Sequence, residues 1–452
     1  MTKKFKDTSL PHYHGENWNK AVLPSHAVNW LAGKERSYNI VNPKQKSLAN
    51  ELEILSTEDR WRWPKKEIYF FSDLHADAEA FAASLVATGA VKRTGAGSTD
   101  FKLTIKPKQA LFIIGGDCFD KGPSNLALLR TIKHLIDLGA KVKLLVGNHD
   151  LRMLLAMRAV DNTDCPRNGH FFVRLGNKVL PFFTEIWHEF LAQKDSLKNI
   201  PDEAECRRRL HPADNWFVEF SDAAKDTISD LEVKKELSRL KKRQQRFEQA
   251  CRDNNFSYRQ LYAVTRLWHE LFLSPKGEFY WFFKKMNLVH KSGSFLFVHA
   301  GSDDKACQLI SKDGIKQLNK QFKLALKGDP FSLYFGELGN MVRTKYRQVD
   351  KALTEDGRKH LHETKIHAIV HGHRNLYHGQ RISLRQGIIN FECDASVDSH
   401  TRENEGLKGA GAAVTIFKPE GKILGISADF PFVKVFEPKA CILYLRAILE
   451  DY

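Results

Sequence analysis

Side chains that bind divalent metals recur in this 452-residue chain directly after short apolar runs. A run of four or five largely apolar residues is typical of a strand that is buried on both faces of a sheet. The loops that follow such strands gather at one edge of the sheet, so polar residues from distant parts of the chain are expected to converge there. The five runs and the residues that follow them are 68–71 with Asp73 and His75, 111–114 with Asp117, 142–146 with Asn148, 295–298 with His299, and 366–370 with His373.

These donor types indicate a particular chemistry. Carboxylate, imidazole and amide oxygen suit Mn, Fe or Zn rather than Cu(I) or an iron–sulfur cluster. Six donors are too many for one catalytic ion that keeps an open position, and they suit two ions roughly 3.5–4 Å apart that share a carboxylate. Such a pair lowers the pKa of a bridging water to about 7 and neutralises charge on a phosphate. The pattern predicts a two-metal phosphoesterase in which a dimetal-bound hydroxide attacks phosphorus.

His149 follows Asn148, and we predict a separate role for it. If Asn148 binds a metal, its neighbour points elsewhere, toward the leaving-group side, where an imidazole can protonate the departing alkoxide. A general acid needs a partner that fixes its tautomer, and Asp120 is the candidate. His149 and Asp120 are therefore the predicted catalytic pair.

Taken together, the motifs resemble the calcineurin-like metallophosphoesterase superfamily, and within it the PPP-type phosphatases. The pattern of that subgroup is D-x-H, G-D-x-x-D-R-G, G-N-H-[DE], H-x-G and a final His. Residues 113–155 are also similar to bacterial diadenosine tetraphosphate hydrolases. The resemblance covers about half of the chain, over 61–158 and 293–428. It implies an α/β fold, in which a metallophosphoesterase β-sandwich is flanked by helices, with a large, mainly helical insertion.

The resemblance also implies a ligand set. Water would complete the shell of the first metal, and one carboxylate would bridge both metals. Mn²⁺ is the expected ion, with Fe or Zn as alternatives. The first metal would be bound by Asp73, His75 and Asp117, and the second by Asp117, Asn148, His299 and His373.

Several positions depart from the family pattern. Lys121 replaces an arginine, which exchanges a bidentate fork for a point charge. Val146 stands where phosphoprotein phosphatases carry a phosphate-binding arginine, and Asn375 stands where the wider superfamily has a last histidine, a change that favours the PPP-type subgroup. Similarity to the dinucleotide hydrolases suggests Arg343 as a phosphate clamp instead. Lys121, Arg343 and Arg374 are thus the expected substrate-binding residues, although an exposed loop arginine is an equally good description of Arg374.

The leading hypothesis is a metal-dependent phosphatase that hydrolyses phosphate monoesters, on a phosphoprotein or a small molecule. Val146 and the stretch after Asp120 favour an alternative, a dinucleoside polyphosphate hydrolase. The net charge of +16 favours another, a nuclease or phosphodiesterase that acts on nucleic acid. Solvated lysines explain that charge about equally well. A non-enzymatic scaffold on the same fold is disfavoured because every expected ligand is present.

The amino-acid composition limits the classes of protein to which this chain can belong. A hydrophobic content of 42% supports a globular fold, and 452 residues imply a core with additions. Seven cysteines without C-x-x-C spacing indicate reduced thiols, and the N-terminus lacks an apolar signal core, so a cytoplasmic location is expected. No apolar run reaches about 18 residues, so no membrane partner is expected.

The spacing of the motifs suggests an order of segments. The gap between the third and fourth motifs predicts an insertion that leaves the core between two site loops, and we expect it to form a lid or a substrate-selecting wall. Helices are predicted at 230–252 and near 261–272. Strands are predicted at 381–384, 388–393 and 413–418, and they should complete the second sheet. The expected segments are an N-terminal extension 1–60, catalytic core 61–160, insertion 161–291, catalytic core 292–430 and a C-terminal tail 431–452.

Overall fold

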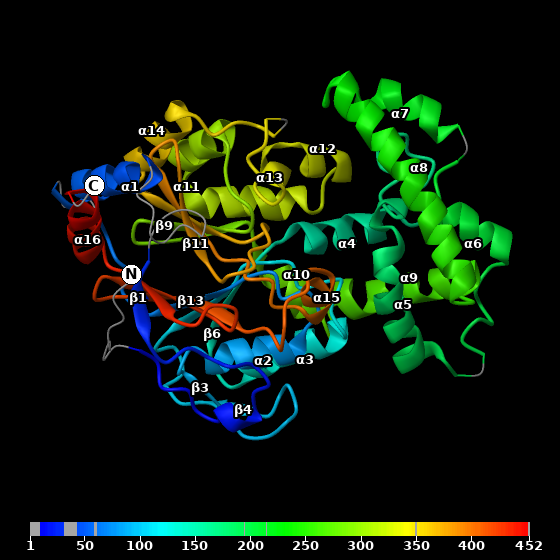
Figure 1. The fold of residues 1–452 in the computed structure, drawn as a ribbon. Coiled ribbons are helices and arrows are strands. Elements are labelled where there is room, and N and C mark those ends of the chain that lie inside the picture. The colour runs from blue at the N-terminus through cyan, green and yellow to red at the C-terminus, as the bar shows by residue number, and fades with distance from the viewer. Residues whose placement is uncertain are drawn as a thin grey trace.

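The structure is a computed structural model, and it describes residues 10–30, 43–57, 61–193, 195–213, 215–348 and 350–450. Two β-sheets form its centre (Figure 1). The larger sheet has the strand order β1 (Ala27–Asn29), β15 (Val433–Phe436), β14 (Lys422–Ser427), β13 (Ala413–Lys418), β2 (Ile68–Phe71), β5 (Leu111–Ile114), β6 (Lys141–Leu145), β7 (Met286–Asn287). The smaller has the order β11 (Arg381–Arg385), β12 (Ile388–Glu392), β10 (Ala368–His371), β9 (Phe295–Val298), β8 (Val289–Ser292). A hairpin of β3 (Val91–Arg93) and β4 (Phe101–Leu103) forms a separate small sheet.

The apolar runs form strands because both of their faces are covered. Every residue of β2 is buried. Successive side chains of a strand point to opposite faces, so Phe70 enters the layer between the two sheets, where its ring centre lies 5.7 Å from that of Phe297. Phe71 points the other way and packs against Phe81 of α2 (Ala78–Val86). The predicted α/β class, with packed sheets flanked by helices, is confirmed.

Parallel pairing places the site loops together. In the larger sheet β2, β5, β6 and β7 are parallel, and in the smaller sheet β9, β10 and β12 are parallel. The carboxyl ends of parallel strands meet at the same edge of a sheet. Helices α2 and α3 (Asn125–Asp137) lie on the outer side of the larger sheet, and α11 (Asp304–Ala325) and α14 (Glu355–Glu363) on that of the smaller (Figure 1).

The later strands are divided between the sheets, which corrects one expectation. Strands β11 and β12 do belong to the second sheet, but β13 pairs antiparallel with β2 and therefore extends the first. The prediction that 413–418 completes the second sheet is wrong. The error arises because a fully buried strand has the same local pattern in either sheet.

Both ends of the described chain join the larger sheet. Strand β1 pairs in parallel with β15, which itself pairs with β14. Helix α1 (Pro43–Thr57) packs against α16 (Pro438–Glu450), so the two terminal segments lie side by side (Figure 1). Residues 1–9, 31–42 and 58–60 of the predicted extension lie outside the described residues.

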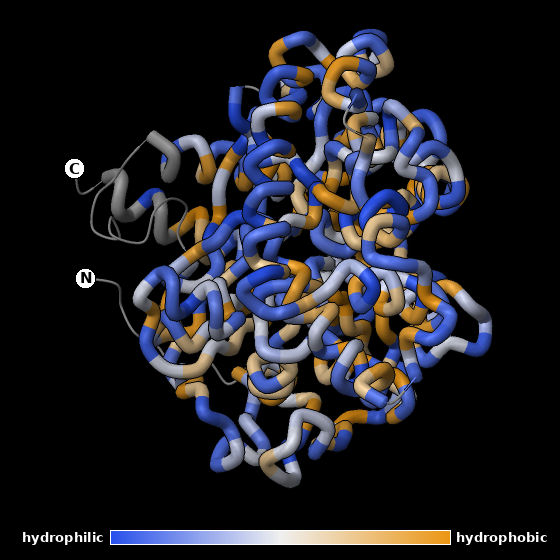
Figure 2. Tube along the Cα trace, turned by 90° about the vertical axis from the view of Figure 1, so that its right-hand side faces the viewer, coloured by the Kyte–Doolittle hydropathy of each residue, from blue (hydrophilic) through white to orange (hydrophobic). Residues whose placement is uncertain are grey.

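The predicted insertion is mainly helical and projects from one end of the molecule (Figure 1). Ser229 and Glu232 form a capping box at the start of α8 (Asp230–Asp253), so the predicted helix begins at its capping signal. Hydrophilic and hydrophobic residues alternate along the helices of this end, which faces the viewer in Figure 2, as amphipathic helices require. The helices are α5 (Leu180–Ile186), α6 (Glu203–Leu210), α7 (Trp216–Ala224), α8 (Asp230–Asp253), α9 (Tyr258–Leu273) and α10 (Tyr280–Lys285).

Strands β7 and β8 begin at Met286 and Val289, so the helical part of the insertion ends at α10. Every helix in the described part of the chain is too short or too polar to cross a lipid bilayer. All seven cysteines are described and none forms a disulfide.

Candidate metal centre

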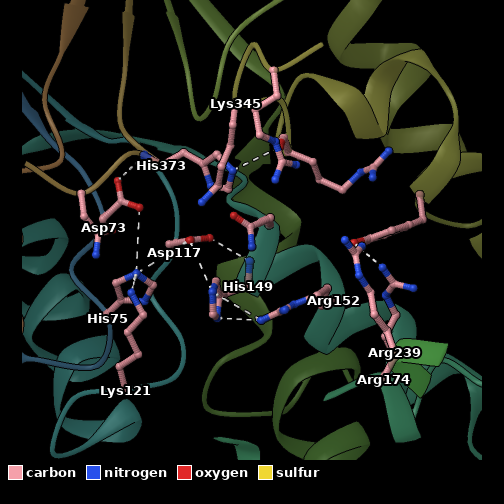
Figure 3. Close-up of a pocket in the computed structure, with 15 residues that line it drawn as sticks. Asp73, His75, Asp117, Lys121, His149, Arg152, Arg174, Arg239, Lys345 and His373 are labelled. Carbon is pink, nitrogen blue, oxygen red and sulfur yellow. Dashed lines mark hydrogen bonds and ion pairs between the residues drawn. The ribbon is translucent and has the colours of Figure 1, made fainter. Parts of the chain in front are cut away.

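The loops after five strands bring the predicted ligands to one place, and Figure 3 shows Asp73, His75, Asp117 and His373 among them. Asp73 and His75 follow β2, and Asp117 follows β5. Asn148 begins α4 (Asn148–Ala159) directly after β6. His299 and His373 follow β9 and β10 of the other sheet, so the centre lies where the edges of the two sheets meet.

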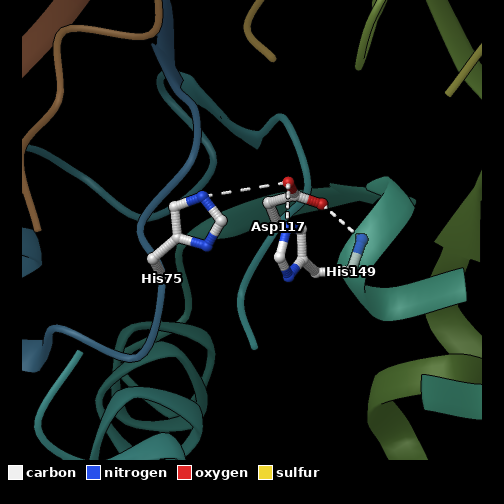
Figure 4. Close-up of side chains that lie close together, drawn as sticks. All are labelled: His75, Asp117 and His149. Atoms are coloured by element: carbon white, nitrogen blue, oxygen red, sulfur yellow. Dashed lines mark hydrogen bonds and ion pairs between the residues drawn. The ribbon is translucent and has the colours of Figure 1, made fainter. Parts of the chain in front are cut away.

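Asp117 lies at the middle of this group (Figure 4). Its Oδ1 accepts a hydrogen bond from the backbone N–H of His149 at 2.8 Å. Its Oδ2 lies 3.9 Å from Nε2 of His75, 3.9 Å from Nε2 of His149 and 3.5 Å from Nε2 of His299. Two donors that bind one ion at roughly 2.1 Å lie at most about 4.2 Å apart. Oδ2 can therefore share one ion with His75 and another with His299.

Two donor groups share this carboxylate. One comprises His75, Asp117 and His149, and the other comprises Asp117, His299 and His373; within each group the donor atoms lie within 4.8 Å of one another. The residues present fit a pair of divalent cations bridged by Asp117, because carboxylate and imidazole are ligands that Mn, Fe and Zn accept.

Asn148 extends the second group. Its Oδ1 lies 2.7 Å from Nδ1 of His373, 3.1 Å from Nε2 of His299 and 3.2 Å from Oδ2 of Asp117. Turning the amide over would convert these contacts into hydrogen bonds. However, an oxygen and two imidazole nitrogens that face a carboxylate oxygen are also what a cation between them requires. We therefore retain Oδ1 as the fourth donor of this group.

Backbone carbonyls orient the imidazoles. Nδ1 of His75 donates to the carbonyl of Phe119 at 3.1 Å, and Nδ1 of His299 donates to that of Gly115 at 2.8 Å. Each bond fixes the orientation of the ring and turns Nε2 toward Asp117, the side on which a cation would bind.

The loops adopt a costly backbone conformation to present these side chains. Asp73, Asp117 and His373 have φ values of 56°, 56° and 65°, in the left-handed region that non-glycine residues seldom adopt. A Cβ on Gly147 would lie 2.2 Å from Oδ1 of Asp117, and one on Gly372 would lie 2.0 Å from Oδ2 of Asp73. Only glycine lets the neighbouring loops approach this closely.

Asp150 holds the Asp117 loop in place, a role that sequence reasoning missed. Its carboxylate accepts hydrogen bonds from the backbone N–H groups of Asp117 at 2.9 Å, Cys118 at 2.9 Å and Gly147 at 2.8 Å. Burial, and then the charge of Asp117, raises the pKa of Asp150 to about 7. Its position, three residues after Gly147 at the start of a helix, was the available signal.

The centre favours positive charge beside Asp117. Although burial opposes it, His299 holds the pKa of Asp117 well below its usual range. Burial would lower the pKa of His299, but Asp117 and Asp73 raise it to about 10. The pKa of Asp73 is raised, chiefly by burial and further by Asp117.

His149 is oriented as the predicted acid would be. Its Nδ1 lies 2.7 Å from Oδ2 of Asp120, which leaves Nε2 directed toward Asp117 and the cavity (Figure 4). Burial, and then the charge of Arg152, lowers the pKa of His149, while Asp117 and Asp120 oppose that shift. Arg152 lies one helical turn after His149 on α4, with Nη2 2.9 Å from Nδ1.

The donors open onto a cavity of about 300 Å³ whose wall is strongly basic. The expected substrate residues Lys121 and Arg343 line it, and Nζ of Lys121 donates to Nε2 of His75 at 2.8 Å. Arg374 lies outside the lining, and its Nη1 donates to Glu392 at 3.2 Å. The cationic residues that line the cavity and that the sequence did not indicate are Arg152, Arg174, Arg239, Lys345 and Arg347.

The Asp117 loop rests on the helical insertion. The ring centre of Phe119 lies 5.3 Å from that of Phe282, 5.4 Å from that of Phe182 and 5.8 Å from that of Phe272. All four rings are buried. Side chains packed this closely move together, so a displacement of the insertion would also displace the loop that carries Asp117.

Tyr334 of α12 (Pro330–Phe335) is surrounded by guanidinium groups. Those of Arg174 and Arg343 each lie 4.4 Å from its ring centre, and Nη2 of Arg174 donates to its hydroxyl at 2.9 Å. Burial alone would raise the pKa of Tyr334, but Arg174, Arg343 and Arg152 lower it to about 7.

Tyr334 should therefore titrate near neutral pH. Because its folded pKa lies below the unfolded value of 10, the free energy of unfolding should rise with pH between these values, and this gain is lost as pH falls through 7. We expect a phenolate absorbance that appears near pH 7 in the wild type and is missing from Tyr334→Phe. Identical absorbance of the two proteins up to about pH 9 would contradict the assignment.

Comparison with known proteins finds a match to one protein family. Residues 66–234 match the family model of the calcineurin-like phosphoesterases. No curated protein sequence matches the chain. Among solved structures, a cold-active protein-tyrosine phosphatase of a psychrophile Shewanella species has 12% sequence identity over 91% of this chain and 92% of that chain, with a TM-score of 0.40. A protein serine/threonine phosphatase from Saccharomyces cerevisiae has 12% identity over 87% of this chain and 90% of that chain, with a TM-score of 0.36. At scores this low, the two likenesses support no further conclusion.

Proposed function

Since the chain carries a calcineurin-like phosphoesterase domain, it is a metal-dependent phosphoesterase, and we propose that it hydrolyses phosphate monoesters at the centre bridged by Asp117. When bound, two divalent cations would acidify water to provide the nucleophile and would offset the charge of the phosphate. Mn²⁺ is the ion that we propose, because the donors are carboxylate, amide oxygen and imidazole, with no thiolate among them.

The observation that carries this proposal is the position of one oxygen atom. Oδ2 of Asp117 lies within 3.9 Å of donors on both sides, from the β2 loop and from the β9 loop. A single-ion site needs no such bridge. The shared oxygen therefore supports two cations that act together on one phosphoryl group.

Residues of the protein would supply the proton and would bind the phosphate. His149, directed into the cavity by Asp120, would give a proton to the departing alkoxide. Arg152 lines the cavity beside His149 and would bind phosphate oxygens, with the planar guanidinium geometry that suits such contacts. Exclusion of bulk water by the buried donors strengthens each of these interactions.

A panel of substrates tests the proposal. With Mn²⁺ added, we expect phosphate release from p-nitrophenyl phosphate and from other monoesters, and we expect EDTA to abolish it. A phosphopeptide, diadenosine tetraphosphate and single-stranded RNA form the comparison arms. Cleavage of the RNA with no release from any monoester would instead indicate a nuclease, and a complete lack of metal-dependent hydrolysis would contradict a phosphatase function.

A further inference from the structure

The cavity wall carries more positive charge than one bound phosphate would neutralise. Seven lysine and arginine side chains line it, whereas Asp73 and Asp117 are its only carboxylates among the described residues. When two carboxylates bind two divalent cations, the positive charge that remains equals the negative charge of one phosphate dianion. The wall therefore leaves uncompensated positive charge, and such a surface attracts a further anion.

The excess charge is concentrated on the leaving-group side. Arg152, Arg174 and Arg239 lie beyond His149, on the side away from His75 (Figure 3). Since His149 is directed toward the oxygen that departs, a group attached to that oxygen would extend toward these arginines.

Contacts with neighbouring residues hold Arg174 of this cluster in place. Arg174 is 7% exposed and is held from behind by an ion pair with the buried Glu236 of α8. Its backbone carbonyl accepts a hydrogen bond from Nη1 of Arg243 at 2.6 Å. Its guanidinium and that of Arg343 each lie 4.4 Å from the ring centre of Tyr334. Preorganised guanidinium groups lose little freedom when they bind an anion.

Two of these arginines come from the insertion. Arg174 lies on the short helix Val173–Leu175, and Arg239 lies on α8, which packs against that helix. The insertion thus forms part of the cavity wall. Arg239 is exposed and makes no hydrogen bond or ion pair among the described residues, so its charge is available to a ligand.

From this arrangement we propose that Arg174, Arg239 and Arg343 form a second anion-binding subsite that holds a phosphoryl group carried by the leaving group. The inference rests on the proposed function, because it assumes that the scissile phosphate lies at the metal centre. The favoured substrates then carry two or more phosphoryl groups, either separate, as in a sugar bisphosphate, or condensed, as in tripolyphosphate.

Arg239→Gln provides the test, and Lys241→Gln is its matched control. Both residues are exposed on α8, but positions two apart on a helix differ by about 200°, and Lys241 does not line the cavity. The Mn²⁺-loaded wild type should show kcat/KM at least roughly tenfold higher for a sugar bisphosphate than for the matching monophosphate. Arg239→Gln should reduce that preference by about tenfold, and Lys241→Gln should retain it. Tripolyphosphate, tested in the same way, distinguishes condensed from separate phosphates.

Binding provides a readout that does not need turnover. Methylenediphosphonate should bind the Mn²⁺-loaded protein more tightly than methylphosphonate in calorimetry, and Arg239→Gln, but not Lys241→Gln, should remove the difference. Equal values for one and two phosphoryl groups, or equal losses in both variants, would overturn the subsite while the phosphatase activity stands. If no monoester or bisphosphate is hydrolysed, the proposed function fails, and the calorimetric comparison alone decides the subsite.

Discussion

Replacing Asp117 with asparagine is expected to lower the turnover of p-nitrophenyl phosphate by roughly a thousandfold or more, because both cations lose the oxygen that they share. The amide can still accept the hydrogen bond that Oδ1 receives from the backbone of His149, so the loop should keep its shape. An amide group at the position of Oδ2 carries no charge to hold cations between His75 and His299. Metal analysis after desalting should therefore find far less Mn²⁺ than in the wild type.

Asp137→Asn controls for the chemical change. Asp137 forms an exposed ion pair with Lys133 on α3, and such pairs contribute less than about 1 kcal/mol. Its activity and metal content should match the wild type. A fully active Asp117→Asn variant with two metals per chain would contradict the bridging role.

Replacing His149 with asparagine should separate acid catalysis from metal binding. With phenyl phosphate, whose phenolate is a poor leaving group, we expect the rate to fall by roughly 10²–10⁴-fold, because the departing oxygen is no longer protonated. With p-nitrophenyl phosphate the loss should be smaller, since that leaving group departs readily as an anion. Metal content should stay near the wild-type level.

This variant also decides between two roles that the geometry allows. Nε2 of His149 lies 3.9 Å from Oδ2 of Asp117, so His149 could serve as a ligand of the first cation. If metal content fell in parallel with activity, and equally for both substrates, the acid assignment would be wrong. Asp120→Asn should give an intermediate loss, because it removes only the partner of Nδ1. His188→Asn, at an exposed position of the insertion, is the histidine control.

The strands and the convergence of the site loops could be predicted from the sequence because their causes are local. A run such as Ile68–Phe71 is apolar at every position, which requires cover on both faces, and parallel strands of this kind end at one edge. That rule alone brings Asp73 and Asp117 together, whereas His373 follows a strand of the other sheet and joins them because the edges of the two sheets meet.

Other features depend on contacts between distant segments and could not be predicted. The first five residues of β13 are buried, and nothing local says that the strand pairs with β2 rather than with the second sheet. Arg174 and Arg239 come from the insertion, and only the packing of α8 against residues 173–179 brings them to the cavity. Arg152 differs, because it lies only three residues after His149, and the helix that starts at Asn148 places it one turn from His149.

The most direct test is an anomalous difference map from crystals of the wild-type protein soaked in Mn²⁺. We predict two peaks roughly 3.5–4 Å apart, one bounded by Asp73 and His75 and the other by Asn148, His299 and His373, with Asp117 in contact with both. A single peak, or a second peak beyond the reach of Asp117, would contradict the two-metal centre.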